Sequence, residues 1–339
     1  MSYVRKKRLP VDSYVDGILS GNRILLSKAI TLVESALPED NALAEEVLSK
    51  VIPYTGRSYR IGITGVPGVG KSTFIDSFGK YVTSLNRKLA VLTIDPSSKR
   101  SKGAILGDKT RMEALSVDPL AFIRPSASGS ALGGVAQKTR ETMFLCEAAG
   151  YEVVFIETVG VGQSEITVNE MVDFFLLLML AGAGDELQGI KKGIMEMADS
   201  IVITKADGEN IKKAERARIE YQNALHLFPP NPAGWYPKVT TCSALEETGI
   251  REIWDIIEEH HQLFQEKGMF AEKRKLQNVA WMHHLIVEIV TQRFYRKEAV
   301  RKIIPEIEKK VATGQIPAIK AARDLMQIHD QPGKGNIDP

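Results

Sequence analysis

Residues 65–73 read GVPGVGKST and fit the phosphate-loop pattern G-x-x-x-x-G-K-[S/T]. An apolar run precedes them and a stretch of helical composition follows, so the pattern lies between a predicted strand and a predicted helix. Glycines let backbone N–H groups wrap phosphates because no Cβ blocks the approach, and the helix N-terminus adds a positive dipole end. The residues expected to hold the phosphates are Gly65, Gly68, Val69, Gly70, Lys71, Ser72 and Thr73. In such loops the lysine, here Lys71, reaches the β- and γ-phosphates, and the hydroxyl, here Ser72, binds Mg²⁺.

Short apolar runs alternate with helical stretches through the middle of the chain. This alternation predicts an α/β fold with a mostly parallel sheet covered on both faces. Sites in such sheets lie at the carboxyl ends of strands, where each motif described here falls. The predicted strands are Arg60–Thr64, Leu89–Ile94, Ala121–Ile123, Val153–Glu157, Phe174–Leu180, Ser200–Thr204 and Lys238–Cys242.

The chain is predicted to have three parts. Residues 1–56 have helical spacing and form an N-terminal extension. Residues 57–264 form the P-loop domain, and residues 265–339 form a second helical segment that packs on the core or on a second subunit.

A second motif, VVFIETVGVGQSE, covers residues 153–165. Its apolar strand ends in Glu157, and Gly160 follows three residues later, as in the ExxG variant of a GTPase switch. Glu157 would hold magnesium directly or through water, and the N–H of Gly160 would turn to the γ-phosphate. The alternative is a strand that ends in a solvated glutamate.

A third motif bears on the choice of base. The segment IVITKAD, residues 201–207, covers the end of the predicted strand and supplies Thr204, Lys205 and Asp207. Asp207 can accept two hydrogen bonds from guanine N1–H and the N2 amino group, a pair that adenine does not offer. Lys205 would lie along the base plane. GTPases usually have asparagine at the position of Thr204, so we expect the amide that braces the phosphate loop to be lost and guanine affinity to be modest.

The segment TCSAL follows the next predicted strand and supplies Ser243, Ala244 and Leu245. A backbone N–H there can meet guanine O6. The alternative for the whole base-binding pattern is a surface KxD turn with no ligand.

Two polar loops contain further candidates. Asp95 and Asp108 are candidate magnesium or water contacts, and solvated loop aspartates are the alternative for both. Gln188 and Lys191, in a glycine-rich segment after the longest apolar strand, could reach the γ-phosphate and stabilise charge in the transition state. The residues alone favour a solvated basic face for this segment.

Composition limits the remaining functions. A net charge of +2 gives no overall attraction to nucleic acid or anionic membranes. The longest apolar run, residues 174–181, is too short for a membrane span of about 20 residues. The two cysteines form no CxxC pair, which favours a reducing compartment, and we expect a cytoplasmic protein. Adjacent histidines at 260–261 and 283–284 point about 100° apart on a helix and do not converge on a metal.

The combination of GVPGVGKST, IDPSS, GDKTRM, ETVGVGQSE, GAGDELQGIKKGIMEMAD and TKAD closely resembles the MeaB/ArgK family, from about residue 15 to about residue 330. The members of this family are GTPase chaperones of adenosylcobalamin-dependent methylmalonyl-CoA mutase. The resemblance implies a SIMIBI-class G domain, slow GTP hydrolysis, and a homodimer formed through the C-terminal arm. It also implies that GTP gates cofactor loading and protects the mutase.

Carried onto this sequence, the resemblance places Ser72, Asp95, Asp108 and Glu157 around Mg²⁺. It assigns Gln188 and Lys191 to a switch that the mutase orders, and Thr204, Lys205 and Asp207 to guanine. Thr204 departs from the asparagine of the family.

Other functions remain open from the sequence. They are a P-loop kinase or ATPase linked to amino-acid transport, a small-molecule phosphotransferase, a nucleotide-binding metallochaperone, and a GTPase that serves a related acyl-CoA mutase.

Overall fold

A computed structural model describes residues 8–94, 112–125, 132–158, 164–182, 192–231 and 233–331. The chain forms two compact units, unit 1 (residues 1–274) and unit 2 (residues 275–339). Unit 1 contains both the N-terminal helices and the predicted P-loop domain. The three-part division at residues 56 and 264 stays a prediction.

Unit 1 is built on a seven-stranded sheet in the order β3-β2-β4-β1-β5-β6-β7, with every neighbouring pair parallel. The predicted α/β fold is confirmed, and each predicted strand is present with ends within one residue of those expected. Strands β1, β2, β4 and β6 are buried at every residue, which explains their continuous apolar runs. The strands are β1 (Tyr59–Gly65), β2 (Leu89–Ile94), β3 (Ala121–Arg124), β4 (Val153–Thr158), β5 (Phe174–Leu180), β6 (Ser200–Thr204) and β7 (Lys238–Thr241).

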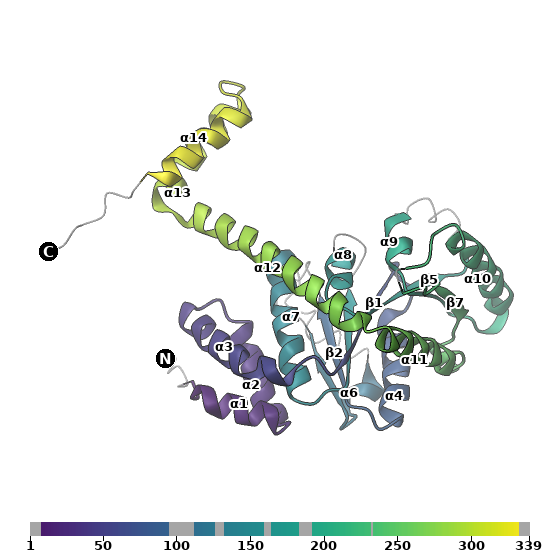
Figure 1. Ribbon diagram of the computed structural model, residues 1–339. Helices are drawn as coiled ribbons and strands as arrows, with labels where there is room; N and C mark the ends of the chain where they lie inside the picture. The colour runs from purple at the N-terminus through teal and green to yellow at the C-terminus, as the bar shows by residue number, and fades with distance from the viewer. Residues whose placement is uncertain are drawn as a thin grey trace. The chain divides into compact units, whose positions relative to one another are not determined.

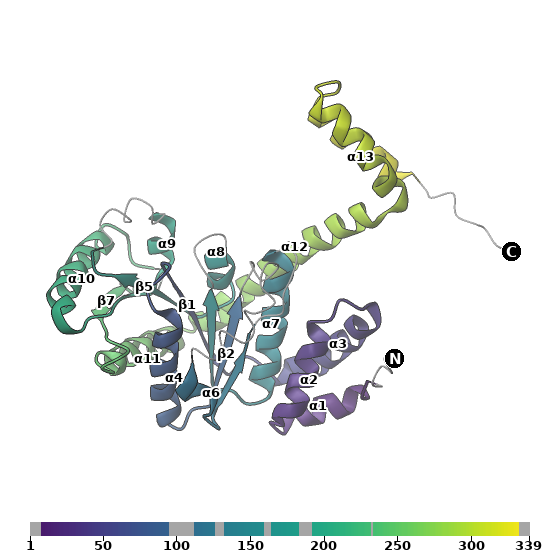
Figure 2. The same ribbon diagram turned by 180° about the vertical axis from the view of Figure 1, so that it is seen from behind.

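Helices cover both faces of this sheet, as Figure 1 and Figure 2 show from opposite sides. On one face α4 (Lys71–Ser84) contacts α6 (Glu113–Ser116) and α11 (Ile250–Glu266). Right-handed crossovers place α7 (Leu132–Ala148), α8 (Ser164–Asn169) and α9 (Lys192–Met197) on the other face. Helix α10 (Ile211–Leu225) packs on β6 and β7.

The direction of the chain changes at β1. The first crossover leads from β1 toward the β3 edge, and later strands return to flank β1 with β4 and β5. Such a switch point is where doubly wound sheets bind ligands, outside the carboxyl ends of the strands. The P-loop follows β1 at this point.

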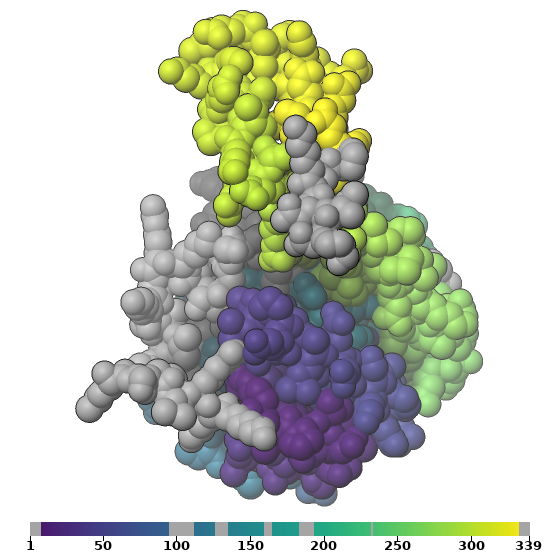
Figure 3. Space-filling view, turned by 90° about the vertical axis from the view of Figure 1, so that its left-hand side faces the viewer, coloured from purple at the N-terminus to yellow at the C-terminus, as the bar shows by residue number. Residues whose placement is uncertain are grey.

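The N-terminal helices α1 (Val11–Leu19), α2 (Arg23–Val33) and α3 (Pro38–Val51) contact one another and α7, and the short helix η1 (Ile52–Tyr54) leads into β1. Figure 3 shows them as one compact purple area on the surface of unit 1. Asn22 caps α2 by accepting hydrogen bonds from the N–H groups of Ile24 and Leu25. Pro38 begins α3 at a position where a missing N–H costs nothing.

Buried ion pairs attach helices at the amino ends of β1 and β5. Arg60 donates two hydrogen bonds to Glu147, at 2.6 and 3.0 Å, and both side chains are almost fully buried. Arg274 donates to both carboxylate oxygens of Asp173, at 2.8 and 2.6 Å. Arg274 also donates to the carbonyl of Ser58, so it joins the start of helix α12 (Met269–Arg296) to the segment before β1.

Unit 2 consists of helices. Helix α12 (Met269–Arg296) begins in unit 1 and continues into unit 2, where α13 (Glu298–Ala312) packs on α14 (Ala318–Asp330). In the described part of unit 2 the buried apolar side chains are Val300 and Ala321. The exposed large apolar side chains of α12 are Leu276, Val279, Met282, Ile286, Val287, Ile289, Val290 and Tyr295. Over the described residues of the whole chain, no helix is long and apolar enough to cross a membrane.

Candidate nucleotide-binding site

The P-loop has the backbone that its glycines allow. Gly68 and Gly70 have φ values of +78° and +90°, in the left-handed region that other residues rarely adopt. An added Cβ at Gly68 would meet nothing within 4 Å, so conformation and not crowding requires glycine there. At Gly65 the reason is crowding, because a Cβ would lie 2.5 Å from the carbonyl oxygen of Leu178 on β5.

Lys71 is the first residue of α4, and its Nζ donates to the carbonyl of Gly65 at 2.8 Å. Burial lowers the pKa of this ammonium group, and the charges of Glu157 and Glu165 act in the opposite direction. Both carboxylates are buried, with 4% and 1% of their surface exposed. The lysine therefore lies at the phosphate loop in the field of two acidic side chains.

The oxygen donors near this lysine fit a magnesium ion. Ser72 lies in the first turn of α4, and Glu157 is on β4, whose residues pair with β1 through the register Ile63↔Glu157. Hydroxyl and carboxylate oxygens are the donors that Mg²⁺ prefers. The described residues contain no group of three His, Cys, Asp or Glu side chains placed to hold a metal. The other two predicted ligands, Asp95 and Asp108, lie outside the described residues.

Two residues at the end of β6 bind the phosphate loop directly. The hydroxyl of Thr204 donates to the carbonyl of Val69 at 2.8 Å, and Lys205 Nζ donates to the carbonyl of Gly68 at 2.8 Å. We expected Thr204 to leave the loop without the brace that asparagine provides. The structure differs, because the threonine hydroxyl reaches the loop carbonyl itself.

The turn after β6 is held in an uncommon conformation. Lys205 has a φ of +57°, which is unusual for a side chain of this size. Asn210 Nδ2 donates to the carbonyl of Lys205 at 2.6 Å, and the Asn210 N–H donates to the carbonyl of Asp207 at 2.9 Å. Asn210 thus closes the turn from both sides.

The carboxylate of Asp207 is oriented by Ser243, whose hydroxyl donates to Oδ2 at 2.6 Å. The N–H of Ser243 donates to the carbonyl of Thr248, so a backbone contact to guanine O6 would come from Ala244 or Leu245. Leu245 is 80% exposed beside this turn. The structure thus brings Asp207 and the TCSAL segment together, as the sequence predicts.

The predicted residues Gly160, Gln188 and Lys191 lie outside the described residues, so their roles stay predictions. The sequence interpretation did not single out Asn210 or Glu165. Asn210 follows TKAD by three residues, a spacing at which an asparagine side chain can close a turn. Glu165 is within the switch motif but had no role assigned.

The phosphate loop lies at the switch point of an all-parallel sheet, and the TKAD turn after β6 donates hydrogen bonds to it. This combination defines a P-loop GTPase. Comparison with known proteins narrows the class. The chain belongs to the MeaB family, described as "Methylmalonyl Co-A mutase-associated GTPase MeaB", whose sequence model matches residues 26–299.

Relatives resemble the chain over most of its length. A protein of Caulobacter vibrioides named "Putative GTPase" is 50% identical over 318 residues, which cover 94% of this chain and 97% of that protein. The mouse protein "Methylmalonic aciduria type A homolog, mitochondrial" is 44% identical over 332 residues, covering 95% of this chain and 80% of that protein. The solved structure "Crystal structure of LAO/AO transport system kinase" is 37% identical, has a TM-score of 0.75, and covers 97% of this chain and 99% of that one.

Proposed function

We propose that this chain binds guanine nucleotides and hydrolyses GTP by the attack of water on the γ-phosphate. The observation that carries the proposal is the attachment of the base turn to the phosphate loop. Thr204 and Lys205 bind successive carbonyls of that loop, and Ser243 orients the Asp207 carboxylate. A base that hydrogen-bonds to Asp207 is therefore held at a fixed position relative to the phosphates. Guanine offers the Asp207 carboxylate two hydrogen-bond donors.

Positioning and charge stabilisation dominate phosphoryl transfer. Lys71 would move from the Gly65 carbonyl to the β- and γ-phosphates, where its charge is needed. Ser72 and Glu157 would hold Mg²⁺, which when bound neutralises charge on the phosphate oxygens. Gln188 and Lys191 are proposed to complete the catalytic site when a partner orders their segment, so intrinsic turnover is slow.

The family description and the mouse relative support a partner. We infer that the chain is a chaperone that uses GTP to gate cofactor loading and protection of an adenosylcobalamin-dependent acyl-CoA mutase, with methylmalonyl-CoA mutase as the first candidate. A reducing compartment such as the cytoplasm agrees with two cysteines, Cys146 and Cys242, that are both buried and unpaired. No role for nucleic acid or a membrane is proposed.

A homodimer is proposed through unit 2. Seven of the eight exposed large apolar side chains of α12 lie between Leu276 and Val290, and their exposed fractions run from 47% at Ile289 to 71% at Leu276. A row of this kind on one helix is typical of an interface, since soluble monomers rarely expose such contiguous apolar surface. A second copy would present the same row and bury both.

The test is phosphate release from GTP and from ATP with Mg²⁺, with and without a cobalamin-dependent acyl-CoA mutase. Slow hydrolysis of GTP alone that rises when the mutase is added is the expected result. Equal use of ATP would contradict the base assignment. GTP specificity without stimulation would contradict the mutase as partner. A phosphorylated small molecule in place of inorganic phosphate would favour the kinase alternative.

A further inference from the structure

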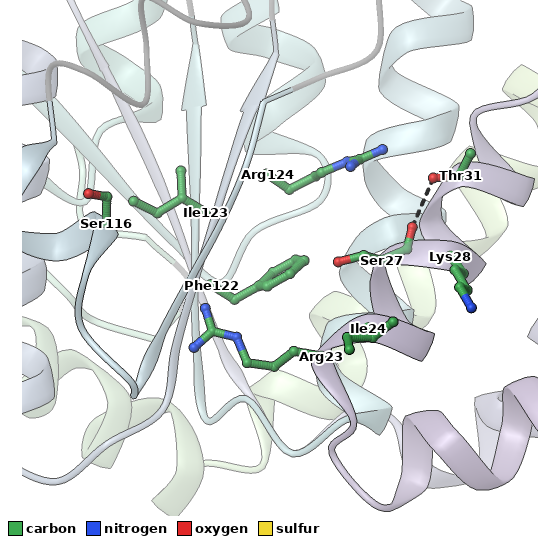
Figure 4. Close-up of a pocket in the computed structure, with 9 residues that line it drawn as sticks. All are labelled: Arg23, Ile24, Ser27, Lys28, Thr31, Ser116, Phe122, Ile123 and Arg124. Carbon is green, nitrogen blue, oxygen red and sulfur yellow. Dashed lines mark hydrogen bonds between the residues drawn. The ribbon is translucent and has the colours of Figure 1, made fainter.

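A cavity lies at the β3 edge of the sheet, away from the nucleotide site. Its volume is about 510 Å³, within the range of about 300–1,000 Å³ that holds small molecules. Helix α2 forms one wall, β3 the floor, and Ser116 of α6 the other side. Figure 4 shows the side chains that line it.

The cavity straddles the edge strand. Phe122 and Ile123 both line it, yet successive residues of a strand point to opposite faces of the sheet. Leu89 donates its N–H to the carbonyl of Leu120, so alternate residues of β3 direct their backbone groups toward β2. Ile123 has the opposite parity, and its own N–H and C=O face the open edge.

This edge is protected against pairing with another strand. Strand β3 has only four residues, and the Arg23 guanidinium donates to the carbonyls of Pro119 at 3.1 Å and Ala121 at 2.6 Å. Pro125, the next residue whose backbone would face outward, has no N–H. Short length, a covering cation and proline all oppose strand addition. Among the described residues, the backbone groups that remain at this edge are the single N–H and C=O of Ile123, which suit a small molecule better than an extended peptide.

The charge of the side chains that line the cavity indicates which class of small molecule it can bind. Among the described residues that line it, three are cationic (Arg23, Lys28 and Arg124) and none is acidic. Arg124 is paired with Glu34, so Arg23 and Lys28 supply the uncompensated positive charge of the lining. The hydroxyl of Ser27 on α2 adds a further polar group beside them.

The cavity also has an apolar side. The Arg23 guanidinium lies 6.0 Å from the centroid of the Phe122 ring, so charge and ring face adjoin. Ile24, which is 68% exposed, adds an aliphatic surface at the same wall. An occupant that satisfies both sides has an acidic group and an apolar body.

We propose that this cavity binds a small organic anion, a carboxylate or a phosphate ester with an apolar body. The acid group meets Arg23 and accepts the N–H of Ile123, while Lys28, which points away from Arg23 on the other side of α2 (Figure 4), adds positive charge without touching the acid. The apolar body lies on Phe122 and Ile24. No nucleotide takes part, so this site is independent of the proposed GTPase activity.

The probes are phenyl phosphate and benzoate, with benzyl alcohol as the neutral control. Binding to the full chain is followed by NMR of isotope-labelled isoleucine methyl groups, because Ile24 and Ile123 both line the cavity. We expect saturable shifts of these two methyl signals with at least one of the anions and not with benzyl alcohol. Binding of phenyl phosphate alone would identify a phosphate ester, and binding of benzoate alone a carboxylate.

Charge reversal gives the matched variants. Lys28→Glu reverses a charge at the wall of the cavity without touching the acid group, so it should weaken the affinity for the anion about threefold. Lys212→Glu, at another exposed lysine, on α10 at the opposite edge of the sheet, should leave the affinity unchanged. The proposal is overturned if neither anion shifts the two signals, if benzyl alcohol shifts them equally, or if both variants weaken binding to the same extent. Binding of a glutamate-rich peptide without either small anion would also overturn it.

Discussion

The hydroxyl of Thr204 donates to the carbonyl of Val69 at 2.8 Å, so the strand that presents the base-binding turn also supports the phosphate loop. Both residues are buried, and the bond crosses from the end of β6 to the loop after β1. A buried carbonyl that loses its donor costs about 1–3 kcal/mol. This single bond therefore contributes to the shape of the loop that binds phosphate.

Thr204→Val keeps the shape of the side chain and removes the donor. We expect GTP affinity to fall about tenfold, equivalent to about 1.4 kcal/mol, as measured by isothermal titration calorimetry. Thr139→Val is the matched control, because the bond that the buried Thr139 hydroxyl makes among the described residues is within its own helix, to the carbonyl of Val135. Equal affinity losses in the two variants would mean that Thr204 acts through general stability and not through the loop.

Asn210→Ala should release the left-handed turn at Lys205. The lost bond to the Lys205 carbonyl is exposed, so its contribution is about 0.5–1.5 kcal/mol and the expected loss of GTP affinity is about threefold to tenfold. Asn223→Ala, on the exposed face of α10, serves as the control. If Asn210→Ala binds GTP as tightly as the control, the turn holds its conformation without this side chain.

Arg274→Ala should destabilise unit 1 by about 3 kcal/mol, because it leaves the Asp173 carboxylate buried without its main partner. Chemical denaturation at pH 7 measures this change. Arg251→Ala, which removes a long exposed ion pair with Asp255, should change stability by less than about 0.5 kcal/mol. Similar losses in the two variants would show that the buried pair is not specially important.

The same pair gives stability a pH dependence. Burial alone would raise the pKa of the Asp173 carboxyl, but hydrogen bonds and charge from Arg274 outweigh it and bring the pKa below the ordinary 3.8. The pair therefore adds stability that is fully present above about pH 4 and is lost as pH falls through the folded-state pKa. In Arg274→Ala the carboxyl pKa rises, so acid unfolding should begin at a higher pH than in the wild type. An unchanged acid midpoint would contradict this assignment.

The exposed apolar row of α12 predicts the oligomeric state. Val287→Lys with Val290→Lys should convert the proposed dimer to a monomer, because each would place a charge in an apolar interface. Sedimentation equilibrium measures the change in mass. Leu227→Lys, at an apolar residue of unit 1 that is 84% exposed, should leave the mass unchanged. A wild-type chain that sediments as a monomer would remove the basis for the proposed dimer.

Much of the fold could be predicted from the sequence, because parallel strands buried on both faces appear as uninterrupted apolar runs. Residues 174–180 are the clearest case. The phosphate loop was predictable for a similar reason, since its function needs glycine at fixed spacing.

Contacts between distant segments could not be predicted. The bond from Thr204 to Val69 joins residues 135 positions apart, and only the packing of β6 beside the P-loop brings them together. The left-handed backbone conformation of Lys205 could not be predicted either, because lysine gives no local signal for a positive φ. The cavity at β3 depends on how α2 packs on an edge strand, and no sequence motif predicts that packing.

Whether Asp207 selects guanine in this site is tested most directly by the nucleotide preference of Asp207→Asn. Phosphate release from GTP, ATP and XTP should be compared for the wild type and this variant. We expect the wild type to use GTP alone and the variant to lose GTP and gain XTP, because an asparagine amide donates to the carbonyl that xanthine has in place of the guanine amino group. Equal use of ATP by the wild type, or GTP use unchanged by the substitution, would contradict this role of Asp207.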